Sequence, residues 1–196
     1  MIVRSRKDPG EPRFALTFDD GPSEWTEPIL DLLATHRARA TFFVVGSAVA
    51  GRERTLGRAR AEGHELGSHT FSHGHPTALG DDELRSEIRR GAAAVGPGAR
   101  LVRPPYGEDA ERFDRLADEL GLGPTVLWSI DPRDWETTDA DVIVARVLAE
   151  AAPGAIVDLH DGRRPQRATV AAVEQLLPAL VERGLRLVTV SELLED

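Results

Sequence analysis

The 196-residue sequence has no cysteine, one lysine, one tyrosine and no long apolar run. The lack of cysteine excludes disulfides and thiolate metal sites but leaves the cellular compartment open. No segment approaches the ~18 consecutive apolar residues typical of a membrane helix. Residues 1–14 carry basic side chains but lack the apolar stretch of a signal peptide. We therefore expect no membrane span, with a cytoplasmic location if Met1 is the true start and an extracellular or cell-wall location if a leader has been removed.

Basic residues are also scarce relative to acidic ones, and the formal net charge is −9. A nucleic-acid partner is therefore not expected, because binding to phosphates requires a basic face. The length and the 41% hydrophobic content suit one globular domain with its own core. We predict an irregular lead-in at residues 1–11 and a single domain at residues 12–196, and the oligomeric state is left open.

Short apolar segments alternate with helical segments from residue 13 onwards. Strands are predicted at residues 13–18, 39–46, at the start of 64–73, and at 100–107, 125–130, 155–160 and 185–190. Helices are predicted at residues 26–36, 47–62, 81–95, 109–121, 139–154 and 167–184. This alternation is typical of an α/β domain with a mostly parallel sheet, either open or closed into a barrel.

The first predicted strand ends in two adjacent carboxylates, Asp19 and Asp20, followed at once by Gly21 and Pro22. Neighbouring like charges cost free energy unless a metal ion, a cation or a shared proton compensates them. A solvated turn is the simpler interpretation, because Asp, Gly and Pro are common turn residues. These residues alone favour the turn.

Other unusual polar residues also follow predicted strands. They are His69, His73, Arg103, Tyr106, Asp131 and His160. Since α/β folds place their sites on the loops that leave the carboxyl ends of strands, these side chains are expected to share one site. The spacing of His69 and His73 lets both rings face one metal ion, and an Asp from the first motif would add a third ligand. Such a set suits catalytic zinc and non-haem iron alike, and ligand types do not choose between them.

The remaining candidates each have a structural alternative. His160 could be a metal ligand, a general acid or base, or a packed core residue. Asp131 could orient His160 and raise its basicity. Arg103 could hold a carboxylate ionised or form a surface salt bridge, and Trp135, like Tyr106, could equally be a core aromatic.

Five motifs occur in order along nearly the whole chain. They are TFDDGP at residues 17–22, HTFSH at 69–73, RPPY at 103–106, DPRDW at 131–135 and DLH at 158–160. In this order the sequence resembles the NodB-type polysaccharide deacetylases, carbohydrate esterase family four, from about residue 12 to residue 194. The resemblance implies a distorted (β/α) barrel of fewer than eight strands. It also implies a divalent metal, usually zinc, with cobalt(II) or another divalent ion as alternatives.

The resemblance further implies a role for each motif residue. Asp20, His69 and His73 would hold the metal. Asp19 would be the general base, with Arg103 keeping it ionised, and His160 would be the general acid, tuned by Asp131. The backbone N–H of Tyr106 would complete the oxyanion site, and Trp135 and Leu159 would line the pocket for the acetyl methyl group. Phe71 and Asp158 depart from the common family pattern.

The function implied is removal of N-acetyl groups from glycans that contain N-acetylglucosamine, of the chitin or peptidoglycan type. An O-acetyl esterase acting on xylan is one alternative, and hydrolysis of a small non-sugar amide is another. A degenerate, purely sugar-binding module is a third possibility. A non-haem iron oxygenase would leave Asp19, Arg103 and the Asp131–His160 pair without a role.

Overall fold

The computed structural model describes residues 1–5 and 11–195, so residues 6–10 of the predicted lead-in lie outside the described part. Within these ranges the strands are β1 (Ile2–Val3), β2 (Arg13–Asp19), β3 (Thr41–Val44), β4 (Glu65–Ser68), β5 (Thr125–Val126), β6 (Ile156–His160) and β7 (Arg186–Leu187). The α-helices are α1 (Thr26–Thr35), α2 (Glu53–Ala61), α3 (Asp81–Val95), α4 (Ala110–Glu119), α5 (Ala140–Glu150), α6 (Arg167–Glu182) and α7 (Val190–Leu194). Short 3₁₀ turns are η1 (Gly46–Ala48), η2 (Pro76–Ala78), η3 (Pro105–Gly107) and η4 (Asp134–Glu136).

Every pairing between these strands is parallel, which confirms the predicted α/β fold with a mostly parallel sheet. The main sheet has the order β4-β3-β2-β6, with β7 also paired to β2, and β1 pairs with β5. The regular ladders leave the sheet open between β4 and β6. Single parallel bridges from Val102 to Ser68 and Thr125, and between Ile130 and Val157, span this interval.

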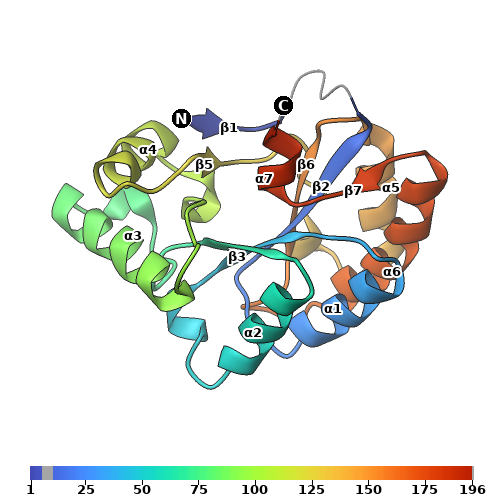
Figure 1. The fold of residues 1–196 in the computed structure, drawn as a ribbon, viewed down its shortest axis with the longest axis horizontal. Helices are drawn as coiled ribbons and strands as arrows, with labels where there is room; N and C mark the ends of the chain where they lie inside the picture. The colour runs from blue at the N-terminus through green and yellow to red at the C-terminus, as the bar shows by residue number, and fades with distance from the viewer. Residues whose placement is uncertain (6–10, 196) are drawn as a thin grey trace.

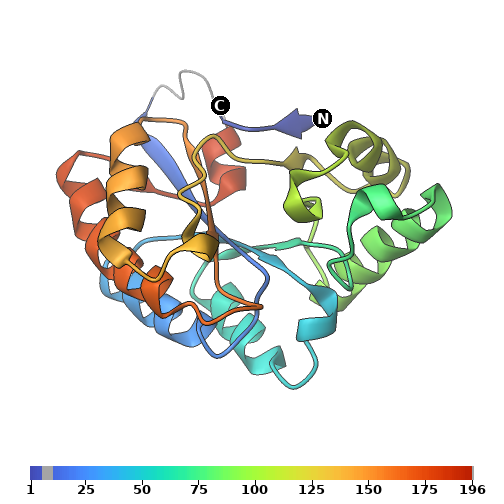
Figure 2. The same ribbon diagram turned by 180° about the vertical axis from the view of Figure 1, so that it is seen from behind.

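The helices surround the strands, with α1, α5 and α6 on one side and α3 and α4 on the other (Figures 1 and 2). Side chains alternate between two cores along β2 and β6. Phe14, Leu16 and Phe18 pack in the larger cluster beneath α1, α5 and α6, whereas Ala15 and Ile156 belong to a smaller cluster enclosed by the strands. Because strand side chains alternate faces, later residues in step with Ala15 and Ile156 also point inward.

Some predicted strands are shorter in the structure, for identifiable reasons. Residues 100–107 contribute only the bridge at Val102, because Pro104 and Pro105 have no N–H to donate to a ladder. The predicted last strand, 185–190, ends early because Thr189 and Glu192 form a reciprocal capping box that starts α7. Ile2–Val3, predicted to be irregular, pairs with β5. Among the described residues, no helix combines the length and apolar character needed to cross a membrane.

Candidate active site

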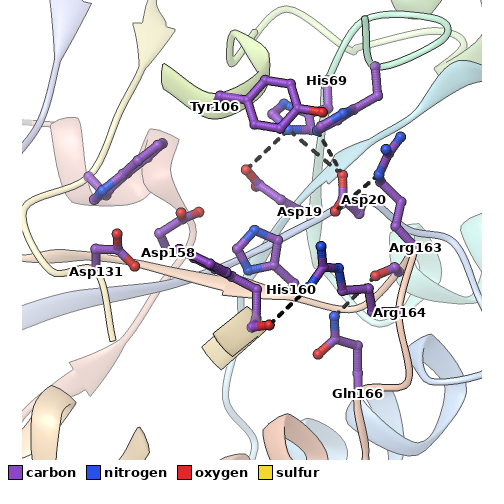
Figure 3. Close-up of a pocket in the computed structure, with 14 residues that line it drawn as sticks. Asp19, Asp20, His69, Tyr106, Asp131, Asp158, His160, Arg163, Arg164 and Gln166 are labelled. Carbon is purple, nitrogen blue, oxygen red and sulfur yellow. Dashed lines mark hydrogen bonds and ion pairs between the residues drawn. The ribbon is translucent and has the colours of Figure 1, made fainter. Parts of the chain in front are cut away.

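A cavity of about 370 Å³ lies where β2, β4 and β6 end, at the edge predicted for the site (Figure 3). Its lining contains most of the predicted site residues, namely Asp19, Asp20, His69, His73, Tyr106, Asp131, Trp135 and His160. The other lining residues are Trp128, Asp158, Gly162, Arg163, Arg164 and Gln166. The structure therefore brings the five motifs together around one space, with Arg103 buried behind its wall.

Asp20, His69 and His73 form a cluster that could hold a metal ion. One ligand atom from each lies within 4.8 Å of the others. Oδ1 of Asp20 lies 3.1 Å from Nε2 of His73 and 4.0 Å from Nε2 of His69. This oxygen is buried and receives no hydrogen bond from the described residues. A divalent cation would satisfy it, so the donor set fits a metal ion.

The protonation of the three side chains favours the same interpretation. Nδ1 of His69 lies 2.9 Å from the backbone carbonyl of Arg103, which only accepts hydrogen bonds, so Nε2 is left free as a ligand. Burial, together with the nearby His69, lowers the pKa of His73 to about 3, which keeps that imidazole neutral. Burial also raises the pKa of Asp20, so a nearby cation would help this carboxyl to ionise.

The backbone around the cavity is unusual at several ligand and lining positions. Asp20, His73, Tyr106 and Arg163 have φ angles of 77°, 60°, 60° and 59°. Non-glycine residues adopt this left-handed region infrequently. In Asp20 it turns the chain directly after β2 and leaves the carboxylate beside the histidines (Figure 3). The HTFSH segment that follows β4 is an irregular loop, so His69 and His73 meet through loop conformation and not through helical spacing.

Asp19, the last residue of β2, is paired with Arg103. Nη1 of Arg103 donates to Oδ1 of Asp19 at 2.7 Å, and the arginine side chain is fully buried. Burial alone would raise the pKa of Asp19, but Arg103, His69 and His160 reverse this and lower it overall. Asp19 therefore stays ionised. The surface salt bridge considered for Arg103 is excluded by its burial.

Arg103 is held in place from several directions. Its Nε donates to the carbonyl of Val126 at 3.1 Å, and Nη2 donates to the carbonyl of Leu127 at 3.3 Å. Nη1 also donates to Oγ1 of Thr17 at 2.8 Å. Thr17 lies two residues before Asp19 and on the same face of β2. The guanidinium lies 4.0 Å from the ring centroid of Phe43. Arg103 thus fixes the position of the Asp19 carboxylate.

The partner of His160 is Asp134, and the prediction of Asp131 is wrong. Nδ1 of His160 lies 2.7 Å from Oδ1 of Asp134, whose Oδ2 accepts hydrogen bonds from the His160 backbone N–H and from Thr169. Asp131 instead accepts a hydrogen bond from the backbone N–H of Arg133. Both aspartates belong to DPRDW, but Asp134 begins η4 and is buried, while Asp131 stays exposed at the cavity rim.

This pairing determines the charge of His160. Burial would lower the pKa of His160, but the hydrogen bond from its ring to Asp134 and the nearby Asp158 and Asp19 carboxyl groups raise it well above its usual range. The imidazole is therefore protonated at neutral pH. It can donate a proton from Nε2 toward the cavity.

Tyr106 and Trp135 form part of the cavity rim and are not core aromatics, since both are substantially exposed. The Tyr106 ring stacks on His75, with centroids 4.0 Å apart, and meets the His73 ring edge-on at 4.7 Å. Within the described part of the chain, its backbone N–H has no acceptor, so it is available to a ligand. Arg133 lies over the Trp135 ring at 5.2 Å.

Leu159 was predicted to line the pocket, and this is wrong. It is fully buried in the larger core, on the face of β6 that it shares with Val157. Asp158 lines the cavity instead, because it alternates in step with Ile156 and His160. Since His160 faces the site, strand periodicity alone would have identified residue 158 as the wall and residue 159 as core.

A family model described as polysaccharide deacetylase matches residues 6–124. This chain belongs to the polysaccharide deacetylase family. A peptidoglycan-N-acetylglucosamine deacetylase of Bacillus cereus is 40% identical to it over 210 residues, covering 99% of this chain and 98% of the relative. A chitooligosaccharide deacetylase of Sinorhizobium fredii is 38% identical over 195 residues, covering 91% of this chain and 90% of the relative.

The fold supports the same assignment. The crystal structure of the Bc1960 peptidoglycan N-acetylglucosamine deacetylase matches this polysaccharide deacetylase chain with a TM-score of 0.91. The two are 33% identical, and the match covers 98% of this chain and 92% of the other. The family resemblance drawn from the five motifs is therefore confirmed. Metal dependence, which is typical of the family, agrees with the Asp20, His69 and His73 cluster.

Proposed function

We propose that this chain is a metal-dependent hydrolase that removes N-acetyl groups from glycans containing N-acetylglucosamine. One observation carries the proposal. An ionised carboxylate, a protonated imidazole and a three-residue metal-ligand cluster face the same cavity. Amide hydrolysis needs a base for water, an acid for the departing nitrogen and a site that stabilises the oxyanion.

Each residue has a role that its surroundings support. Asp19 is the base, because Arg103 holds its carboxylate ionised at the cavity wall. His160 is the acid, because Asp134 keeps its ring protonated and oriented. The unpaired N–H of Tyr106 is positioned to donate to the oxyanion. Trp135 contributes an apolar wall beside the acyl group.

The metal that the site is proposed to hold is zinc, bound by Asp20, His69 and His73. Two imidazoles and one carboxylate, with coordination positions left open, are typical of catalytic zinc. When bound there, the ion would supply Lewis acidity that acidifies water and polarises a carbonyl. Among the described residues, Asp20, His69 and His73 form the one cluster of this kind.

A His73→Ala variant is expected to bind zinc at least about a hundredfold more weakly, because loss of even outer-shell partners weakens metal sites 10–100-fold. The measurement is competition for zinc with a chromophoric chelator, with bound zinc determined after dialysis. His75→Ala is the matched control, since this nearby histidine contacts Tyr106 and Glu108 but is not part of the cluster. Equal zinc affinity in the two variants would contradict the assignment.

The contact between Asp134 and His160 predicts how kcat/KM depends on pH. An Asp134→Asn variant removes the negative charge beside His160, so the pKa of His160 falls. Because His160 must be protonated to act as acid, the alkaline limb of kcat/KM moves to lower pH. Asp131→Asn should leave that limb in place, since Asp131 does not contact the ring. A shift in the Asp131 variant alone would reverse the assignment made from the structure.

The test of the function itself is acetate release from N-acetylglucosamine oligomers by zinc-loaded protein, compared with acetylated xylan and small amides. Acetate from the oligomers in preference to xylan supports the N-deacetylase. Release from xylan alone would establish the esterase, and release from small amides alone would establish the metabolite amidase. Saturable oligosaccharide binding without turnover of any substrate would establish a binding module.

A further inference from the structure

Asp158 lines the cavity and accepts a hydrogen bond from the same Arg103 nitrogen as Asp19, the proposed base. Its Oδ1 lies 3.0 Å from Nη1 of Arg103, the same nitrogen that donates to Asp19 at 2.7 Å. Asp158 pairs with Thr17 in the β2–β6 ladder, two positions before the Asp19–His160 pair. The carboxyl group therefore lies beside the proposed base and the proposed acid, on the side of the cavity where Figure 3 draws Asp131.

The geometry of amide cleavage determines which part of a substrate meets this wall. The scissile nitrogen must face His160, which protonates it, and the carbonyl oxygen must face the Tyr106 amide and the metal-ligand cluster. The carbonyl carbon has one more substituent, the methyl or other alkyl group of the acyl chain. With the nitrogen and the oxygen placed in this way, we expect that group to point toward Asp158. An apolar wall was expected there, but Leu159 packs in the opposite core.

The second oxygen of Asp158 is available to a ligand. Within the described part of the chain, Oδ2 makes no hydrogen bond to protein, and the residue lines the cavity. Burial and then the Asp19 carboxylate raise the pKa of Asp158 well above its usual range. A carboxyl oxygen can accept a hydrogen bond from a hydroxyl, and a carboxyl group that holds a proton can also donate one, whereas an acetyl methyl group offers no partner.

We propose that Asp158 is a specificity-determining residue that makes this enzyme favour N-acyl groups with a terminal hydroxyl, such as hydroxyacetyl, over N-acetyl groups. The inference rests on the proposed amidase function. The step is hydrolysis: the water oxygen bonds to the carbonyl carbon, the C–N bond breaks and the nitrogen takes a proton. The products are hydroxyacetate and the free amine, and no oxidant or reductant is needed.

The experiment compares kcat/KM of zinc-loaded protein on glucosamine oligomers carrying hydroxyacetyl, propionyl or acetyl amides. Propionyl is the matched substrate, because it has nearly the size of hydroxyacetyl but no hydroxyl. A buried polar group that pairs with a substrate hydroxyl discriminates against the analogue lacking it, so we expect the wild type to prefer hydroxyacetyl over propionyl by about tenfold or more. Asp158→Leu should abolish this preference, while Asp158→Asn should retain much of it.

Asp131→Asn is the control variant, because Asp131 lines the same cavity at its exposed rim and should not alter the preference. A wild type that cleaves propionyl and hydroxyacetyl equally well would overturn the inference, even if the leucine variant failed to fold. An unchanged preference in an active Asp158→Leu protein would overturn it too. Cleavage of acetyl without the hydroxyacetyl preference leaves the proposed function standing, whereas cleavage of none of the amides overturns both.

Discussion

An Asp19→Asn variant is expected to lose acetate release by at least about a hundredfold in kcat, which is the usual contribution of a general base. Asparagine can still accept a hydrogen bond from Arg103 through its side-chain oxygen, so the buried arginine keeps a partner. It carries no negative charge and cannot take a proton from water. The measurement is kcat on N-acetylglucosamine oligomers, with zinc content determined on the same samples.

Measured zinc content distinguishes the proposed role of Asp19 from that of Asp20. Asp19→Asn should bind zinc normally, because Asp20 and not Asp19 belongs to the ligand cluster. Asp20→Asn should lose both zinc and activity. Asp131→Asn is the control for removing a cavity carboxylate and should remain close to wild type. Activity above half of wild type in the Asp19 variant would show that another group takes the proton.

An Arg103→Met variant is expected to have the largest effect on stability, a loss of about 3–5 kcal/mol in the free energy of unfolding. Arg103 is fully buried, and removing it leaves the Asp19 carboxylate without its cation. The carbonyls of Val126 and Leu127 lose their donors at the same time. Urea denaturation of metal-free protein measures the change without a contribution from ligand binding.

Two further variants test whether the loss of stability comes from the unpaired Asp19 charge. The double variant Arg103→Met with Asp19→Asn should recover part of the lost stability, because it no longer buries an unpaired charge. Arg85→Met, which removes an exposed guanidinium that pairs with Asp82 and Glu119, should change the unfolding transition little. No recovery in the double variant would indicate that lost packing and backbone hydrogen bonds, and not the buried charge, dominate the Arg103 effect.

The fold class and the two histidines of the metal cluster were predictable from local signals, whereas the choice of Asp20 over Asp19 came from the family resemblance. Alternating apolar and amphipathic segments indicated the parallel sheet, and strand ends indicated where polar side chains would gather. Asp20, His69 and His73 then converge because β2 and β4 end at the same edge. The His69–His73 spacing pointed to the right residues for a partly wrong reason, since a loop and not a helical turn joins them.

The errors concern residues whose direction depends on tertiary structure. Asp131 and Asp134 lie three positions apart in one motif, and only the η4 turn decides which reaches His160. The choice of Leu159 instead of Asp158 as a pocket residue was avoidable. Side chains alternate along β6, so once His160 faces the site, Asp158 must face it too and Leu159 must face the core. Full burial of Arg103 was not foreseeable from sequence, since Phe43 and the carbonyls that hold it come from distant segments.

The left-handed residues around the cavity bear on attempts to make this protein more heat-resistant. Non-glycine residues in that conformation cost about 1–3 kcal/mol each, and Asp20, His73, Tyr106 and Arg163 all line the site. Glycine would relieve this strain, but at Asp20 and His73 it would delete a side chain of the proposed metal site. Arg37 has the same backbone conformation in an exposed turn after α1, away from the cavity. Engineering for thermostability should therefore begin at Arg37, because glycine there touches no residue of the proposed metal site.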